Sequence, residues 1–337
     1  MQNINKTPIL SWARRFGAKL STALLLGFAG AAACAAPLNV TLLGTGSPIP
    51  TSNRFSQSTL IEAGKQKLLF DVGRGVVTRI SQLGIPLRDI DATFISHFHS
   101  DHIVGLPDLW LTSRLPTGFG SRKQPMAVYG PEGTVAMTDN LVKAYSRDIE
   151  IREADELIPP SSNKFDAHDI TPGVVYEKDG VKVTAFETHH GDLITPNYGY
   201  IIEYDGKKVL ITSDTTYDER IAQQGKGADM IIHEVAAIDP GLLKEYPRFK
   251  EINAHHTTPE EAGRIFTMAA PRLAAYTHII IIKPDQPLEQ PTDEVVTRTR
   301  ATYKGPLVVG EDLMRFEIDK DIKVFDANKK PVAIDMG

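Results

Sequence analysis

The sequence contains one cysteine, Cys34, among its 337 residues. A disulfide within the chain is therefore excluded, and so is a metal site built from several thiolates. Cys34 also lies in an amino-terminal segment that we expect to be removed, so the mature chain has no cysteine nucleophile. Any metal site must then be built from nitrogen and oxygen ligands.

The chain begins with an apolar run, residues 20–30, that is short for a membrane-spanning helix. Four basic residues precede it and small residues follow it. A basic start, a short apolar middle and a small-residue end are typical of a secretory signal peptide, which we place at residues 1–36 with cleavage near Ala35 or Ala36. The sequence thus predicts a periplasmic or secreted protein without a membrane span.

Two features of residues 1–36 could indicate a variant of this export signal. Residues 31–34 form a partial lipoprotein box, but the leucine that usually stands three places before the cysteine is missing, which disfavours a lipid anchor at Cys34. Arg14 and Arg15 are a twin-arginine pair with poorly fitting neighbours. An ordinary cleaved signal remains the prediction.

Negative charge is in modest excess, with 37 lysines and arginines against 42 acidic residues. Loss of residues 1–36 leaves 33 basic against 42 acidic residues and a formal charge of −9. Such a balance argues against the large basic face that an extended nucleic acid requires. With 42% hydrophobic residues the chain is long enough for a full core, and we predict a single domain over 37–337.

Short apolar segments alternate with turn residues beyond residue 37, the pattern of a strand-rich α/β protein. Helices are predicted over 75–83 and from Pro259, behind a cap at Thr257 or Thr258. Residues 150–176 are polar and without clear period, and we predict an irregular insertion there. The strands fall into two series, 38–44, 58–63, 67–72 and 92–96, then 181–188, 199–204, 208–212, 229–235 and 273–282.

Three histidines and an aspartate lie within residues 97–102, directly after a predicted strand. His97 and His99 are two positions apart, so their side chains point the same way on an extended segment. Asp101 and His102 follow where the chain turns. The alternative is a polar turn that contains histidines by chance. Because three of the ten histidines lie within six positions, we instead interpret these side chains as metal ligands.

Further candidate ligands follow later predicted strands: His190, Asp214 and His278. Each taken alone is better explained as a structural histidine or a helix-capping aspartate. Taken together, their order along the chain after the histidine cluster indicates further metal ligands.

The complete series resembles the metallo-β-lactamase superfamily, in its ribonuclease Z and arylsulfatase-like branch. The resemblance covers about residues 38–318. It is carried by the histidine cluster, His190-Gly191, Ser213-Asp214-Thr215 and Thr277-His278, together with 43–48, 69–75, 91–96, 198–200 and His233-Glu234.

The resemblance implies an α/β fold, a four-layer αβ/βα sandwich, with two metal ions between the sheets. Zinc is the usual metal, and manganese or iron also suit such ligands. The ligands carried over are His97, His99 and His190 for the first ion and Asp101, His102 and His278 for the second, with Asp214 bridging both. A hydroxide between the metals would be the nucleophile, and Asp101 would orient it.

The resemblance also marks His256 as a group that protonates the leaving group or steadies charge in the transition state, with Glu234 orienting its ring. The alternative is that neither residue has a catalytic role, His256 being part of a polar loop and Glu234 a buried carboxylate at a strand end. His255 is the competing candidate for His256, and His189 for His190.

A shared aspartate disfavours a true β-lactamase, and predicted export with an acidic mature chain disfavours transfer-RNA processing. Residues 305–314 resemble the ending of the arylsulfatase-like members. We therefore predict an exported binuclear zinc hydrolase of small anionic esters, aryl sulfates or phosphodiesters. A lactone or carboxylic ester hydrolase, a ribonuclease Z-type nuclease, a non-catalytic metal-binding protein and a homodimer stay open.

Overall fold

The computed structural model describes residues 38–284 and 291–337. The predicted signal peptide and Cys34 lie outside the described residues, so export stays a prediction. Within these two ranges no helix combines the length and the apolar character needed to cross a bilayer.

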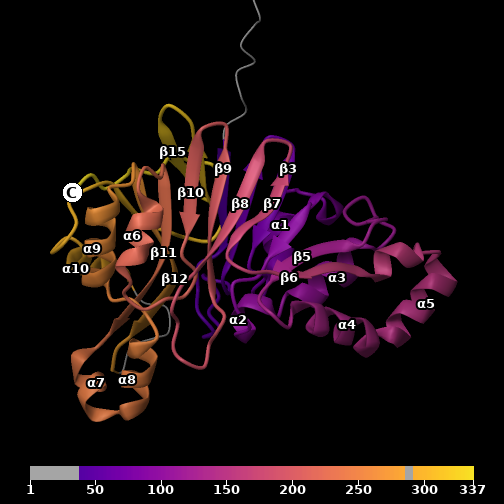
Figure 1. The fold of residues 1–337 in the computed structure, drawn as a ribbon, viewed down its shortest axis with the longest axis horizontal. Helices are drawn as coiled ribbons and strands as arrows, with labels where there is room; N and C mark the ends of the chain where they lie inside the picture. Colours follow the sequence, from indigo (N-terminus) through magenta and orange to yellow (C-terminus); the bar gives the residue numbers. More distant parts are fainter. Residues whose placement is uncertain (1–37, 285–290) are drawn as a thin grey trace, which may run out of the picture. The chain divides into compact units, whose positions relative to one another are not determined.

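Two large β-sheets organise the described residues (Figure 1). The first has eight strands in the order β15-β14-β1-β2-β3-β4-β5-β6. Their bounds are β1 (Leu38–Gly44), β2 (Ser58–Ala63), β3 (Gln66–Phe70), β4 (Ala92–Phe94), β5 (Met126–Gly130), β6 (Phe165–Asp169), β14 (Met314–Ile318) and β15 (Ile322–Phe325).

The second sheet has seven strands in the order β13-β12-β11-β10-β9-β8-β7. In each sheet the parallel pairs lie at one side, β3 to β6 in the first and β10 to β13 in the second. The bounds are β7 (Gly173–Lys178), β8 (Val181–Glu187), β9 (Tyr198–Tyr204), β10 (Lys207–Ile211), β11 (Met230–Ile238), β12 (Leu273–Ile282) and β13 (Leu307–Val309).

Helices join the strands and cover the outer faces of the sheets (Figure 1). The α-helices are α1 (Val76–Gln82), α2 (Ser100–Ile103), α3 (Leu106–Ser113), α4 (Thr134–Ala144), α5 (Ser146–Glu156), α6 (Glu219–Gly225), α7 (Pro240–Glu245), α8 (Pro247–Ala254), α9 (Pro259–Ala269) and α10 (Asp293–Thr299). Two short 3₁₀ helices are η1 (Leu87–Asp89) and η2 (Pro160–Asn163).

The core has three apolar layers, one between the sheets and one under each set of helices. Between the sheets, Phe94 of the first contacts Tyr200 of the second with ring centroids 5.7 Å apart. Trp110 of α3 belongs to the cluster outside the first sheet, and Phe266 of α9 to the cluster outside the second. The four-layer sandwich predicted from the sequence is thereby confirmed.

Helix α9 shows why its start could be predicted. The Thr258 side chain accepts a hydrogen bond from the backbone N–H of Glu261, and the Glu261 carboxylate accepts one from the N–H of Thr258. This reciprocal capping box satisfies two of the free N–H groups at the helix start. Of the two threonines proposed as the cap, the structure selects Thr258.

The irregular insertion predicted over 150–176 is wrong. That segment holds the end of α5, the helix η2, the strand β6 and the start of β7. Strand β6 lies at one edge of the first sheet and β7 at one edge of the second, and none of their residues is buried. Because their pairing comes from backbone hydrogen bonds to β5 and β8, no apolar alternation marks them in the sequence.

His233 is a fully buried histidine on β11 that lies outside the candidate site. Its Nδ1 donates to the carbonyl oxygen of Glu234 at 2.7 Å, its Nε2 has no hydrogen-bond partner, and its ring packs edge-on against Phe266. Burial lowers the pKa of His233. The folded protein therefore holds it neutral.

We expect His233 to weaken the fold in acid. The unfolded chain takes up a proton as the pH falls below about 6.5, whereas the folded chain resists it until its own lower pKa is reached. Between pH 7.5 and 5.5 the wild type should lose about 1 kcal/mol more unfolding free energy than His233→Phe. Urea unfolding at both pH values measures this, with His168→Phe, at a half-exposed position, as control. Equal losses in all three proteins would contradict the expectation.

Candidate metal centre

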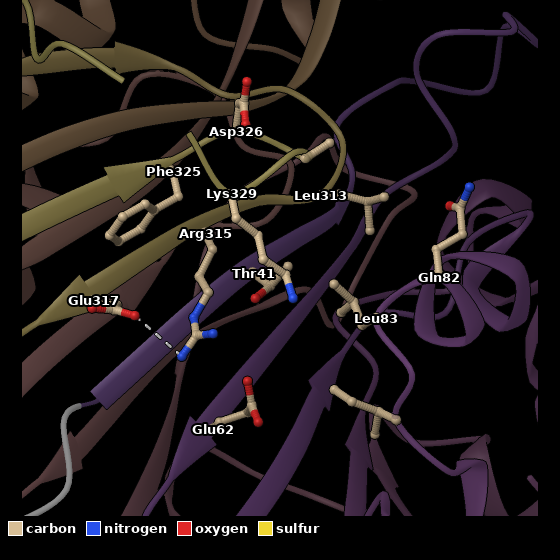
Figure 2. Close-up of a pocket in the computed structure, with 12 residues that line it drawn as sticks. Thr41, Glu62, Gln82, Leu83, Leu313, Arg315, Glu317, Phe325, Asp326 and Lys329 are labelled. Carbon is tan, nitrogen blue, oxygen red and sulfur yellow. Dashed lines mark ion pairs between the residues drawn. The ribbon is translucent and has the colours of Figure 1, made fainter. Parts of the chain in front are cut away.

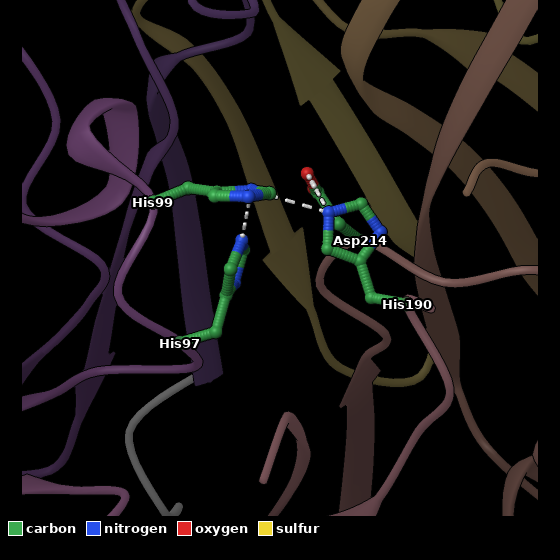
Figure 3. A group of neighbouring side chains, drawn as sticks. All are labelled: His97, His99, His190 and Asp214. Carbon is green, nitrogen blue, oxygen red and sulfur yellow. Dashed lines mark hydrogen bonds and ion pairs between the residues drawn. The ribbon is translucent and has the colours of Figure 1, made fainter. Parts of the chain in front are cut away.

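The candidate site lies where strands of the two sheets end (Figure 3). His97 and His99 follow β4, and α2 starts at Ser100, so Asp101 and His102 stand in its first turn. The short helix turns the chain back and brings these two side chains to the same place as the two preceding histidines.

The second sheet supplies three more side chains. His190 follows β8, Asp214 follows β10, and His278 lies within β12 at an interruption of its pairing with β11. His278 has φ 43°, and Ser213, beside Asp214, has φ 56°. Left-handed backbone is uncommon for residues other than glycine and tends to be kept at functional sites, where it aims particular side chains.

These seven side chains form two groups. The ligand atoms of His97, His99, His190 and Asp214 lie within 4.8 Å of one another. The same holds for a second group, Asp101, His102 and His278. His189 belongs to neither group, because its side chain is half exposed and its nearest carboxylate is that of Asp192.

Asp214 contacts both groups through one oxygen. Its Oδ2 is 3.5 Å from Nε2 of His190 in the first group. The same oxygen is 3.4 Å from Nε2 of His102 and 3.3 Å from Nε2 of His278 in the second. Its Oδ1 is buried and has no hydrogen-bond partner. This placement is what a carboxylate shared between two cations requires.

The histidines of the first group are in the protonation state that a metal cation needs. Burial lowers the pKa of His97 well below its ordinary value and that of His190 to about 4. Both imidazoles are then neutral, the form that binds a metal. Nε2 of His97 lies only 2.9 Å from Nδ1 of His99, which in turn lies 3.3 Å from Nε2 of His190.

Excess negative charge marks the second group. Burial opposes protonation of His102, but the carboxylates of Asp214, Asp71 and Asp101 together raise the pKa of His102 well above its ordinary value. A divalent cation could take the place of that proton. Nε2 of His102 is buried without a hydrogen-bond partner. Five imidazoles and two carboxylates therefore fit two borderline metal ions such as zinc, with manganese or iron also admissible.

Asp71 is a residue of the site to which the sequence analysis gave no role. Its Oδ2 lies 2.7 Å from Nδ1 of His102 and accepts a hydrogen bond from Oγ of Ser96. Its Oδ1 accepts from the backbone N–H of Ser96. Because β3 pairs in parallel with β4, the residue after β3 stands beside the chain that enters the histidine cluster. The sequence offered one indication of this role, because Asp71 is a polar residue at the end of the apolar strand β3.

Asp71→Asn is expected to weaken the metal bound through His102 by about 10–100-fold, because a carboxylate behind a metal-bound histidine orients the ring and raises its basicity. Competition with a chromophoric chelator measures the affinity. Asp91→Asn is the control, since this carboxylate accepts a backbone hydrogen bond from Lys67 at the opposite end of the same strands. Equal affinities in both variants would disprove the role of Asp71.

His256 forms a further group with Asp214 and His278, whose ligand atoms also lie within 4.8 Å of one another, and Glu234 contacts its ring. Oε2 of Glu234 is 3.3 Å from Nδ1 of His256, and its Oε1 accepts from the backbone N–H of Thr257. The His256 ring lies 4.9 Å from that of His190 and 5.6 Å from that of His278. Burial would lower the pKa of His256, but the charge and hydrogen bond of Glu234 outweigh it and raise the pKa to about 9. This geometry suits a proton donor held by a carboxylate.

A separate hollow of about 310 Å³ lies on the first sheet, between β1, β14, the turn after β15 and the end of α1 (Figure 2). Thr41, Leu83, Leu313, Arg315 and Phe325 are among its lining residues. None of the seven residues of the candidate metal centre lines it, so it is not the substrate entrance of that centre.

The chain was compared with known proteins. The family model described as "Anti-Pycsar protein Apyc1" matches residues 38–245. A "Ribonuclease Z" of Mycobacterium bovis (strain BCG / Pasteur 1173P2) is 35% identical over 286 residues, which are 83% of this chain and 98% of that protein. The chain thus spans nearly the whole of this relative.

Solved structures share the fold. The metallo-β-lactamase fold protein YhfI from Bacillus subtilis aligns with a TM-score of 0.65 at 20% identity, over 84% of this chain and 100% of that one. The short form of human tRNase Z aligns with a TM-score of 0.60 at 21% identity, over 83% and 99%. At these identities the likeness bears on the fold, which it confirms.

Proposed function

This chain belongs to the metallo-β-lactamase superfamily of hydrolases and is ribonuclease Z-like, and from that premise we propose that it hydrolyses phosphodiester bonds. The observation that carries the proposal is the single Asp214 oxygen within 3.5 Å of ring nitrogens from both groups of candidate ligands.

Each group has a separate task in this proposal. His97, His99 and His190 would hold one metal ion, Asp101, His102 and His278 would hold the other, and Asp214 would serve both. A pair of metal ions supplies an activated water and neutralises charge on the attacking and leaving oxygens of an ester. The protein's own contribution is to keep these side chains oriented, as Asp71 does for His102.

The proton for the leaving oxygen comes from His256 in this proposal. Glu234 stabilises the protonated ring and fixes its Nδ1, so that Nε2 is free to donate. Both ends of the Glu234 carboxylate are engaged, one by His256 and one by the N–H of Thr257. The ring therefore has a fixed orientation relative to the metal ligands His190 and His278.

We further propose that the substrate is a small anionic diester outside the cytoplasm. The formal charge of −9 left after removal of residues 1–36 opposes a polyanion. RNA is the second candidate, because the relatives are named ribonuclease Z. Aryl sulfates are the third, since the same residues would clamp either ester.

The test is the hydrolysis rate of zinc-reconstituted protein on bis(nitrophenyl) phosphate, nitrophenyl sulfate, a nitrophenyl carboxylic ester and a precursor tRNA with a 3′ trailer. Preference for the small diester, lost on chelation, supports the proposal. A higher rate on the precursor tRNA would make RNA the substrate, and a higher rate on nitrophenyl sulfate would make the protein a sulfatase. Preference for the carboxylic ester, or no turnover on any of the four, would refute it.

A further inference from the structure

The loop after β8 meets the end of α8 at the metal centre. His190 and Gly191 open this loop, and His255 is the residue that caps α8. Two separate contacts join them, one through the backbone of His255 and one through its ring. Neither His255 contact has a part in the proposed reaction.

The backbone contact orients a candidate metal ligand. Nδ1 of His190 donates to the carbonyl oxygen of His255 at 2.7 Å, since a carbonyl can only accept. Nδ1 must then carry the proton, and Nε2 is left with a free lone pair. That nitrogen lies 3.3 Å from Nδ1 of His99 and 3.5 Å from Oδ2 of Asp214. The carbonyl of His255 thus selects the tautomer and aims the ring.

The ring contact depends on a glycine. Gly191 has φ 112°, in the region that disfavours side chains. A Cβ at this position would lie 2.9 Å from Cδ2 and 3.1 Å from Nε2 of the His255 ring. The ring therefore rests directly on the backbone of the loop. A side chain at 191 would displace this ring, which belongs to the same residue whose carbonyl oxygen binds His190.

His255 also terminates a helical arm, defined here as α7 and α8. Neither helix buries any of its residues. They lie beyond the ends of β11 and β12 (Figure 1). The chain returns from this arm to the centre through His255, His256 and Thr257, where the N–H of Thr257 binds Glu234 and the carbonyl of Thr257 binds Ala236. The end of α8 is therefore joined to His190 through His255 and to Glu234 through His256 and Thr257.

We propose that His255 is a positioning residue, through which the α7–α8 arm sets the orientation of His190 and the affinity of the first metal site. His255 belongs to none of the groups of candidate ligands, so this effect is indirect. The inference rests on the proposed assignment of His97, His99 and His190 to one metal ion. It extends that assignment to a segment that does not itself contact the ion.

Gly191→Ala is the first test, made in the full chain. The metal-free protein is titrated with Co²⁺, and binding is followed by the ligand-field spectrum and by competition with a chromophoric chelator. We expect the first site to weaken by about 10–100-fold, as for loss of a residue behind a metal-bound histidine. The second site, through Asp101, His102 and His278, should keep its affinity.

The chain offers a matched control in Gly206→Ala. Gly206 also has a left-handed backbone, φ 74°, but a Cβ there meets nothing within 4 Å. This variant carries the backbone strain without the contact, so both metal affinities should equal those of the wild type. The double variant Gly191→Ala/His255→Ala makes room for the new Cβ and should bind the first metal more tightly than Gly191→Ala alone.

The outcomes separate this inference from the proposed function. A wild type that binds fewer than two metals would refute the assignment itself. Two metals in the wild type, with Gly191→Ala indistinguishable from Gly206→Ala or not improved by the second change, would overturn the role of His255 alone. If Gly191→Ala does not fold, His255→Ala decides. We expect the first site to weaken by less than the roughly 10–100-fold effect of losing a whole partner, because the carbonyl oxygen on His190 is kept, with the second site unchanged. Affinities equal to those of the wild type would reject the proposal.

Discussion

Replacing Asp214 by alanine is expected to lower the hydrolysis rate at least about 10³-fold and to leave fewer than two metals per chain. Asp214 is buried, and one of its oxygens contacts both groups of ligands. Its loss removes a ligand from each proposed ion at once, and about 4 kcal/mol of lost transition-state stabilisation corresponds to this change in rate. Metal content by elemental analysis and the rate on bis(nitrophenyl) phosphate provide the measurement.

Asp192→Ala is the matched control for Asp214. Asp192 lies in the loop after His190, and its side chain is 99% exposed. The substitution removes a carboxylate close to the centre but leaves both groups of ligands intact. The variant should therefore keep both metals and the hydrolysis rate of the wild type. If Asp214→Ala also kept two metals and full activity, Asp214 would not be a shared ligand and the proposed mechanism would be wrong.

His256→Ala is expected to lower kcat by about 10²–10³-fold while both metals stay bound, because a positioned proton donor contributes about that much. Glu234→Gln should act in the same direction, since it removes the charge that keeps His256 protonated. The double variant should be little worse than His256→Ala, because the two residues act as one unit. Steady-state rates and metal content of the three variants test this.

His189→Ala is the control for the histidine substitution. His189 is the neighbour of a candidate ligand, yet its side chain is half exposed and lies outside both groups. The metal content and the hydrolysis rate should therefore match those of the wild type. That result would also exclude His189 as a metal ligand in place of His190. Loss of a metal in His256→Ala would mean that His256 is a ligand and not a proton donor.

Much of the fold follows from short stretches of sequence. Strands β1 and β2 have the predicted bounds, and α9 starts where a threonine cap and a glutamate three residues later indicate it. The irregular insertion predicted over 150–176 failed because β6 and β7 are edge strands without buried residues. Such strands exist because a neighbour offers hydrogen bonds, which no local pattern records.

The chemistry of the site was determined by the sequence alone. One cysteine excluded thiolate sites, and three histidines and an aspartate within residues 97–102 pointed to a metal centre of nitrogen and oxygen ligands. The later candidates completed the ligand set only through the resemblance to the metallo-β-lactamase superfamily that their order along the chain carries. Neither the cluster nor the resemblance needs coordinates.

Only the tertiary structure decided which side chains share one volume. Asp101 and His278 are 177 positions apart and meet at 3.1 Å because the two sheets pack face to face. The strand order of the second sheet, in which β8 and β10 flank β9, brings His190, and not its neighbour His189, to Asp214. The parallel pairing of β3 with β4 places Asp71 behind His102, and the end of α8 places His255 behind His190. Spacing along a chain cannot select among such residues, because the choice depends on which strands pair and where each one ends.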